Sequence, residues 1–150
     1  MKIWYIPSLP LNQCFFPTNS KKNELVNFLF TQLEEYGDAK KDITKAISYS
    51  VKEFASHGGF TLMITNDKKI VGVTVVNETG MSGYIPENIL VYIATHKDFR
   101  GKGLGKKLMQ EAINFAKGDI ALHVEANNPA KHLYEKLGFT APYLEMRLKK

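Results

Sequence analysis

The sequence predicts an α/β (α+β) fold in which helices flank a mixed β-sheet, in the order β-α-α-β-β-β-α-β-α-β. Runs of strand-forming residues alternate with segments whose apolar residues recur at helical spacing. A short polar turn joins two of the runs, which predicts an antiparallel hairpin. A later strand–helix–strand crossover requires parallel pairing, so the sheet must be mixed. No repeat or linker interrupts residues 1–150, and this length suits one domain.

The first third of the chain is predicted to form one strand and two helices. Lys2–Ile6 is rich in aromatic and β-branched residues and reads as a strand. Ser20 is the expected N-cap of a helix that Gly37 ends. Asp38 is the expected N-cap of a second helix, which continues to Gly58.

The middle of the chain predicts three strands. Phe60–Thr65 and Lys69–Asn77 flank the turn residues Asn66–Lys68 and form the hairpin. A loop with two glycines and a proline, Glu78–Pro86, follows. Asn88–Thr95 is almost entirely apolar, as expected of a strand that is covered on both faces.

The last third begins with a helix after a glycine-rich turn, and Gly118 ends that helix. Ile120–Ala126 is then a predicted strand. A short helix begins at Pro129, because proline suits the first helical turn, and reaches Leu137. Tyr143–Leu148 is predicted to be the last strand.

The composition excludes several classes of protein. Hydrophobic residues make up 44% and charged residues 23%, which is typical of a globular domain and not of a coiled coil or a disordered chain. No apolar run approaches the roughly 20 residues that cross a bilayer, so no membrane association is expected. The one cysteine, Cys14, cannot form an intrachain disulfide, which favours the cytoplasm. The four histidines lack metal-ligand spacing, so no metal site is predicted.

Positive charge is concentrated in the last 55 residues. They hold eleven basic and six acidic residues, whereas the first 95 residues hold nine of each, so the whole net charge of +5 lies after Thr95. This asymmetry indicates a local anion site. A solvated basic face is the alternative. Nucleic-acid binding is not expected, because the helix after the glycine turn has only three lysines and its other face is apolar.

The glycine turn, defined here as residues 100–106, is the strongest local signal. It links a buried strand to a helix, and residues 97–107 hold five basic and one acidic residue. Glycines let a ligand approach the backbone, and the first N–H groups of a helix have no internal partner. The pattern therefore predicts a site for a di- or polyphosphate. Its spacing fits neither a P-loop nor the dinucleotide fingerprint. A structural turn that binds nothing is the alternative.

Two motifs resemble those of the GNAT superfamily of acetyl-CoA-dependent N-acetyltransferases. Residues 100–105 resemble its Arg-x-x-Gly-x-Gly signature, and residues 127–139 resemble its Asn-x-x-Ala-x-x-x-Tyr-x-x-x-Gly-Phe element. The resemblance is specific from about Ile89 to Phe139 and weak before Phe60. It implies a single GNAT-like domain over residues 1–150.

The resemblance implies acetyl-CoA as the cofactor. The N–H groups of the glycine turn would hold the pyrophosphate, and the end of the preceding strand would present backbone groups to the pantetheine arm and the thioester carbonyl. The residues implied to bind coenzyme A are Ile93, Ala94, Thr95, Arg100, Gly101, Lys102, Gly103, Leu104, Gly105, Lys106, Asn127 and Lys131.

The resemblance also implies two catalytic residues. Tyr134 would protonate the departing thiolate, since a phenol is protonated at neutral pH. A core aromatic is the alternative. Glu87 is the candidate base that deprotonates the acceptor ammonium, and Tyr92 and Glu125 are weaker candidates. Because residues 88–95 include no carboxylate, direct attack by the neutral fraction of the amine stays open.

The acceptor is expected to be a primary amine of a small molecule or a peptide. Phe15, Phe16, Tyr36 and the loop at residues 78–86 are candidates for the walls of its pocket, with core packing and a plain surface loop as alternatives. The alternative function is a catalytically inactive acyl-CoA-binding sensor or regulatory module. A homodimer is compatible with the resemblance, but no sequence feature demonstrates one.

Overall fold

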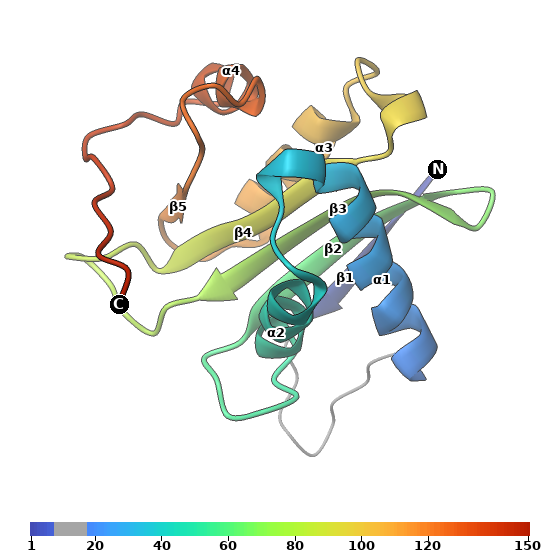
Figure 1. Ribbon diagram of the computed structural model, residues 1–150, viewed down its shortest axis with the longest axis horizontal. Helices are drawn as coiled ribbons and strands as arrows, with labels where there is room; N and C mark the ends of the chain where they lie inside the picture. The colour runs from blue at the N-terminus through green and yellow to red at the C-terminus, as the bar shows by residue number, and fades with distance from the viewer. Residues whose placement is uncertain (8–17) are drawn as a thin grey trace.

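The computed structural model describes residues 1–7 and 18–150, and its centre is a five-stranded sheet (Figure 1). Cys14, Phe15 and Phe16 lie outside the described residues. The strands lie side by side in chain order: β1 (Lys2–Pro7), β2 (Gly59–Asn66), β3 (Lys69–Glu78), β4 (Asn88–Thr95) and β5 (Ile120–Leu122). Strands β1 to β4 pair antiparallel, whereas β4 and β5 pair parallel. The predicted mixed sheet is confirmed.

Helices cover both faces of this sheet. The helices α1 (Thr18–Leu33) and α2 (Lys40–Ser50) cover one face, with the 3-10 turn η2 (Glu34–Tyr36) between them. Helix α3 (Leu104–Phe115) covers the other face and follows the 3-10 turn η3 (Lys97–Phe99). The short helix α4 (Ala130–Lys136) follows β5. In the described part of the chain, no helix is long and apolar enough to cross a membrane.

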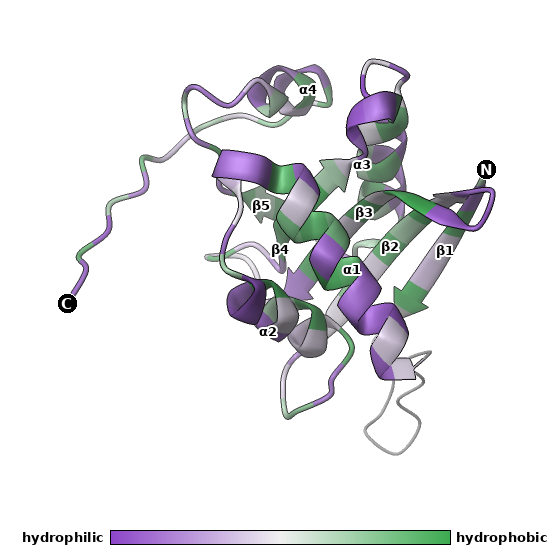
Figure 2. Cartoon of the chain, turned by 45° about the vertical axis from the view of Figure 1, so that its right-hand side comes forward, coloured by the Kyte–Doolittle hydropathy of each residue, from purple (hydrophilic) through white to green (hydrophobic). Residues whose placement is uncertain are grey.

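Two hydrophobic cores hold these layers together. The first lies between the sheet and the α1–α2 pair, and the second lies between the sheet, α3 and α4. Figure 2 shows that the strands behind α1 are largely hydrophobic, and the buried residues of α1 that pack on this core are Leu25, Val26 and Leu29. Residues with essentially no exposed surface in the first core are Leu25, Leu29, Ile43, Ile47, Val73 and Val75. Their counterparts in the second core are Leu62, Ile64, Val76, Leu108, Met109 and Ala112.

The hairpin of β2 and β3 has the predicted turn. Asp67 and Lys68 both have positive φ angles, 48° and 66°, which matches the twist of two antiparallel strands. Gly72 on β3 lets α3 pack closely, because a Cβ there would lie 2.9 Å from Leu108 Cδ1.

Strands β4 and β5 pair over only three positions, from Asn88 with Ile120 to Leu90 with Leu122. At that point the register of β4 against β3 shifts, so that Val91 has no partner in the ladder. Such a β-bulge bends a strand and increases its twist. The predicted strand over residues 120–126 is therefore too long, because β4 turns away from the chain after Leu122.

The first two helices differ from the prediction at their ends. Helix α1 begins at Thr18, whose Oγ1 accepts a hydrogen bond from the Lys21 N–H at 3.3 Å, so Ser20 is not the N-cap. Helix α2 has Ala39 as its N-cap and ends at Ser50. Asp38 does not cap it, because its carboxylate accepts a hydrogen bond from Tyr92 on β4. The helix stops early because Lys52 adopts a positive φ of 58°.

The prediction of a last strand over Tyr143–Leu148 is wrong. This segment lies outside helices and strands, and its apolar side chains are exposed. A strand needs a partner for its backbone groups, and no described residue pairs with this one.

Candidate active site

The glycine turn presents a row of unpaired N–H groups at the end of β4. Among the described residues, none of the N–H groups from Gly101 to Lys106 donates a hydrogen bond. The first bond of α3 runs from the Lys107 N–H to the Gly103 carbonyl at 3.0 Å. Unpaired N–H groups at the N-terminus of a helix favour an anion.

Gly101 and Gly103 are required by the backbone conformation of this turn. Their φ angles are 74° and 80°, which L side chains rarely adopt. A Cβ at either position would meet no atom within 4 Å, so the space above the turn is open to a ligand.

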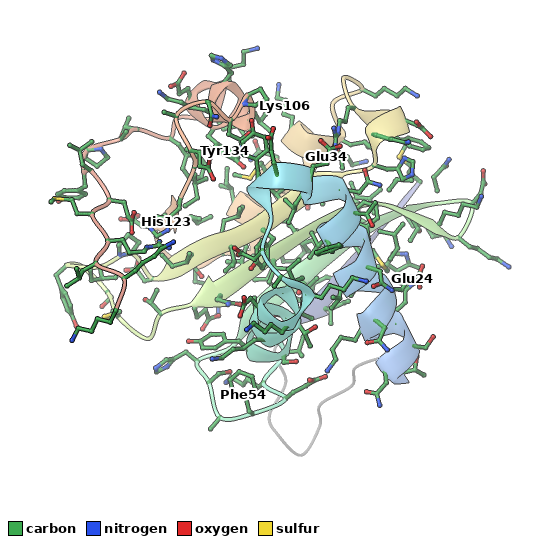
Figure 3. All side chains as sticks on the ribbon, in the orientation of Figure 1. Glu24, Glu34, Phe54, Lys106, His123 and Tyr134 are labelled. Atoms are coloured by element: carbon green, nitrogen blue, oxygen red, sulfur yellow. The ribbon has the colours of Figure 1, made fainter. Side chains whose placement is uncertain are left out.

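Gly105 has a different role, which joins the two sequence motifs. A Cβ at this position would lie 3.3 Å from Leu133 Cδ2 on α4. The glycine thus permits close packing of α3 and α4, and it places the glycine turn beside Leu133 and its neighbour Tyr134. Figure 3 shows Lys106 and Tyr134 at the same end of the molecule.

The side chain of Arg100 points to helix α1. Its Nη2 donates to the Gln32 carbonyl at 2.8 Å and lies 3.4 Å from Glu34 Oε1. The Lys97 N–H also donates to the Gln32 side chain, at 2.9 Å. These bonds fix the end of α1 against the glycine turn. They do not use the N–H groups of the turn, which stay available to a ligand.

Exposed lysines surround the glycine turn and supply its positive charge. Lys106 and Lys107 are exposed on the first turn of α3. The ammonium of Lys102 lies over the ring of Phe99, 5.0 Å from its centroid. Lys131 lies 3.7 Å from Glu135 on α4, in an exposed pair that contributes little to stability.

The open edge of β4, residues 91–95, leads into this turn. Past Leu90 this edge has no β5 partner, so the backbone groups that point away from β3 lack a ladder bond. Ile93 and Thr95 are half-buried and Ala94 is buried. Asn127 is exposed after β5, and its carbonyl accepts a weak hydrogen bond from the Tyr36 hydroxyl at 3.5 Å.

Tyr134 is a buried phenol on α4, with 7% of its surface exposed. Burial raises its pKa to about 12. Its hydroxyl has no hydrogen-bond partner among the described residues, yet it is not among their fully enclosed polar atoms. Tyr134 is therefore a protonated donor at neutral pH whose hydrogen stays available to a ligand.

Glu87 lies at the opposite end of β4 from the glycine turn. Its Oε2 accepts a hydrogen bond from the Asp119 N–H at 2.7 Å, and this bond lowers the pKa of the carboxyl. A Cβ at Gly118 would lie 2.6 Å from the Glu87 carboxyl carbon, so the two chain segments pack closely. This arrangement favours a structural role for Glu87 over that of a base.

The structure brings a second carboxylate, Asp38, to the middle of β4. The Tyr92 hydroxyl donates to Asp38 Oδ2 at 2.6 Å, and burial followed by this bond raises the pKa of Tyr92. Asp38 itself is exposed, and its carboxylate contacts the side chain of Tyr92, one of the residues of the open edge. Asp38 was not predicted as a site residue, because its place before a helix suggested a cap. No local pattern could reveal a contact across 54 positions.

The loop between α1 and α2 adds further acidic groups on the same side. Glu35 and Glu125 both raise the pKa of Tyr36, after the larger effect of burial. The surroundings of β4 are thus basic at the glycine turn and acidic where this loop crosses toward Asn127. Among the described residues, no group of His, Cys, Asp or Glu could hold a metal ion.

Comparison with known families identifies the class of this protein. Residues 57–141 match the model of the acetyltransferase (GNAT) domain, so the chain belongs to the GNAT acetyltransferase family. It is an acyltransferase of this family. The matched region includes both motifs and the whole of β4.

Curated relatives support this assignment at low identity. The chain is 25% identical to N-alpha-acetyltransferase 30 of Schizosaccharomyces pombe, over 67% of this chain and 71% of the relative. It is 27% identical to 5-NmdU N-acetyltransferase of Pseudomonas phage PaMx11, over 73% and 76%. The fold also resembles a chain of the NatC complex bound to Gag peptide and CoA, with a TM-score of 0.67 and 20% identity, over 93% of this chain and 86% of that one.

Proposed function

We propose that this protein transfers an acetyl group from acetyl-CoA directly to a primary amine. The observation that supports this proposal is the contact of Gly105 with Leu133, which brings a turn of unpaired N–H groups next to the buried phenol of Tyr134. An anion site beside a proton donor suits a cofactor with a pyrophosphate and a thiol leaving group.

The glycine turn and the open edge of β4 fit coenzyme A. When bound, acetyl-CoA supplies an acetyl group that is activated as a thioester. The N–H groups from Gly101 to Lys106 would hold the pyrophosphate, and the nearby lysines would add charge. Backbone groups of Ile93–Thr95 would bind the pantetheine arm, and an N–H there would stabilise charge on the carbonyl oxygen. Asn127 and Lys131 are the remaining residues that we propose to bind coenzyme A.

Tyr134 would act as the general acid. In the transfer a nitrogen–carbon bond forms and a carbon–sulfur bond breaks, while the amine loses a proton and the sulfur gains one. The Tyr134 hydroxyl would give its proton to the departing sulfur and recover one from solvent. The high pKa of this phenol keeps it protonated throughout the physiological range.

Two carboxylates are candidates for the group that binds the amine of the acceptor. Asp38 is exposed beside the open edge, and Tyr92 orients its carboxylate. Glu87 is bound to the Asp119 N–H. We therefore propose that Asp38 binds the acceptor ammonium and orients the amine after it loses its proton. Asp38→Asn should raise KM for the amine at least several-fold, with unchanged affinity for acetyl-CoA in calorimetry.

The acceptor would be an amine on a small molecule or a peptide. The acidic groups around the α1–α2 loop favour a cationic acceptor over an anionic one. The names of the curated relatives differ in their acceptors, so the family alone does not select one. The single cysteine supports placement in the cytoplasm.

Calorimetric titration with acetyl-CoA is the first test, with free coenzyme A and ATP as comparison ligands. We expect micromolar binding of acetyl-CoA and no binding of ATP at the same concentration. A panel of amines, followed by thiol release, then tests turnover. Binding without turnover of any amine would support a sensor instead, and a folded protein that binds none of the ligands would contradict the cofactor site.

A further inference from the structure

Arg100 stands at the start of the glycine turn, but within the described residues its side chain forms hydrogen bonds with the end of helix α1. Its Nη2 donates to the Gln32 carbonyl at 2.8 Å, and both Nη atoms lie 3.4 Å from Glu34 Oε1. The Gln32 side chain accepts a further bond from the Lys97 N–H at 2.9 Å. The end of α1 is therefore tied at two points to the segment that leads into the glycine turn.

The contacts of Arg100 complete the C-terminus of α1. The last four carbonyls of an α-helix have no partner within the helix, and the negative end of the helix dipole favours a cation. Gln32 is the last residue but one of α1, and the last turn of α1 has no basic residue of its own. Arg100 supplies this cation from a segment 68 positions away.

The residue that follows α1 has an unusual backbone conformation. Glu34 has a φ of 55°, in the left-handed region that residues other than glycine rarely adopt. Such a conformation persists only where the surrounding contacts hold it. The side chains of Arg100 and Glu34 are 45% and 58% exposed, so their ion pair adds little to the stability of the fold. The contacts of Arg100 instead fix the direction in which the chain leaves α1.

This direction determines where Asp38 lies. The connection from α1 to α2 crosses in front of the sheet (Figure 1) and is held at two further points. The Tyr36 hydroxyl donates to the Asn127 carbonyl at 3.5 Å, and the Tyr92 hydroxyl donates to Asp38 at 2.6 Å. Arg100 and Tyr92 thus hold the two ends of one short connection, and a displaced end of α1 would carry Asp38 away from β4.

We propose that Arg100 is a positioning residue for the acceptor and that its side chain does not bind coenzyme A. By holding the end of α1 it places Asp38 where that carboxylate binds the acceptor ammonium, so this inference rests on the proposed function. The guanidinium is already paired with Glu34, and the anion site then depends on the N–H groups of the turn and on its lysines. Figure 3 shows Glu34 at the end of the molecule that also carries Lys106 and Tyr134.

Arg100→Gln tests this assignment in steady-state kinetics and calorimetry. The probes are acetyl-CoA and the amine of highest turnover in the panel. KM for that amine should rise by about tenfold, because the group that binds it is misplaced. Kd for acetyl-CoA should change by less than about threefold, because the exposed charge that is removed was already paired. Weaker binding of acetyl-CoA with an unchanged KM for the amine would identify Arg100 as a cofactor ligand and overturn the proposal.

Two further variants separate positioning from a loss of charge or of stability. Arg100→Lys keeps a charged donor that can make one of the two contacts, so its KM for the amine should lie between those of the parent and of Arg100→Gln. Lys21→Gln is the matched control, since it removes one charge from an exposed ion pair with Glu24 near the other end of α1. It should leave both constants unchanged. A rise in KM equal to that of Arg100→Gln would contradict a specific role of Arg100.

Hydrogen exchange tests the same contact without an acceptor. The amides of Gly37, Asp42 and Ile43 donate to carbonyls of residues 34–39. In Arg100→Gln these amides should exchange faster, whereas those of the hairpin of β2 and β3 should not change. Unchanged exchange at all three amides would overturn the positioning role. A parent that binds acetyl-CoA but acetylates no amine would count against the proposed function, and faster exchange in the variant would still show that Arg100 holds this connection.

Discussion

The two ends of β4 differ in how completely their polar groups are paired. At the start of the strand, the buried Asn88 side chain donates to the Lys117 carbonyl at 2.8 Å and to the Asp119 carbonyl at 3.2 Å. The Asn88 N–H also donates to the Asp119 carbonyl, and the Glu87 carboxylate accepts a hydrogen bond from the Asp119 N–H. At the other end, the N–H groups from Gly101 to Lys106 donate no bond within the described residues.

The difference in pairing suggests that the start of β4 stabilises the fold, whereas the turn after its end serves function. Buried or half-buried polar groups are normally paired, so the complete hydrogen bonding at the start of β4 is explained by stability alone. A row of unpaired donors in a defined conformation needs another explanation, and the proposed binding of an anion would supply it. Changes at the open end should therefore affect binding and rate, whereas changes at the closed end should affect folding.

The largest effect is expected from Tyr134→Phe at the open end. Loss of the general acid should lower kcat by roughly 10²–10⁴-fold. The affinity for acetyl-CoA should barely change, because the ring and its packing remain. Since the pKa of Tyr134 is about 12, the parent rate should rise with deprotonation of the amine and show no alkaline decline from this group below that pH.

Steady-state rates and calorimetry across pH check this expectation. Unchanged turnover of the variant at every pH would remove Tyr134 from the reaction and return it to the second core as an ordinary aromatic residue.

Gly103→Val should weaken acetyl-CoA binding by about tenfold or more. The positive φ of Gly103 strains any side chain, at a cost of about 1–3 kcal/mol, and the new side chain would occupy the open space above the turn. Gly83→Val is the matched control, because Gly83 has a φ of 77° and equally open surroundings in the β3–β4 loop. Equal affinity of the two folded variants would contradict the anion site.

Asn88→Ala should lower the free energy of unfolding by about 1–3 kcal/mol, since it removes the two hydrogen bonds that the buried Asn88 amide makes at the closed end. Chemical denaturation measures this loss. Calorimetry on the folded variant should give the parent affinity for acetyl-CoA. A variant of full stability but poor affinity would erase the distinction between the two ends.

Glu87→Gln should have the smallest effect on rate and a pH-dependent effect on stability. The pKa of Glu87 is lowered in the folded state, so its contribution is present above the unfolded pKa of about 4.3 and disappears as the pH falls through the lower folded value. The stability difference between parent and variant should shrink below about pH 4.

Thermal unfolding of both proteins across pH 3–7 measures that difference. A kcat more than about tenfold lower in Glu87→Gln, with normal stability, would instead identify Glu87 as the general base.

Most of the fold was predictable because its signals are local. The hairpin of β2 and β3 follows from a polar turn between two strand-forming runs, and β4 follows from an apolar run of strand length. Two features were missed. Helix α2 ends early because of one backbone angle at Lys52, and the segment at residues 143–148 lacks a strand partner despite its strand-like pattern.

The candidate site also has features that the sequence predicts and features that depend on the whole fold. The glycine turn and Tyr134 follow from residue types at fixed spacing, since both the backbone conformation and the capacity to donate a proton are properties of those residues. By itself, then, the sequence determined the order of the elements up to α4, the place of the glycine turn and the family motifs.

Only the tertiary structure decided how these parts meet. The contact of Gly105 with Leu133 joins the two motifs, the bulge at Val91 opens the edge of β4, and the hydrogen bond from Tyr92 brings Asp38 to that edge. The hydrogen bond from the Asp119 N–H to Glu87 also joins residues that are far apart in the chain. Each depends on residues that are distant in the chain, and packing and hydrogen bonding between distant residues are set by the whole fold.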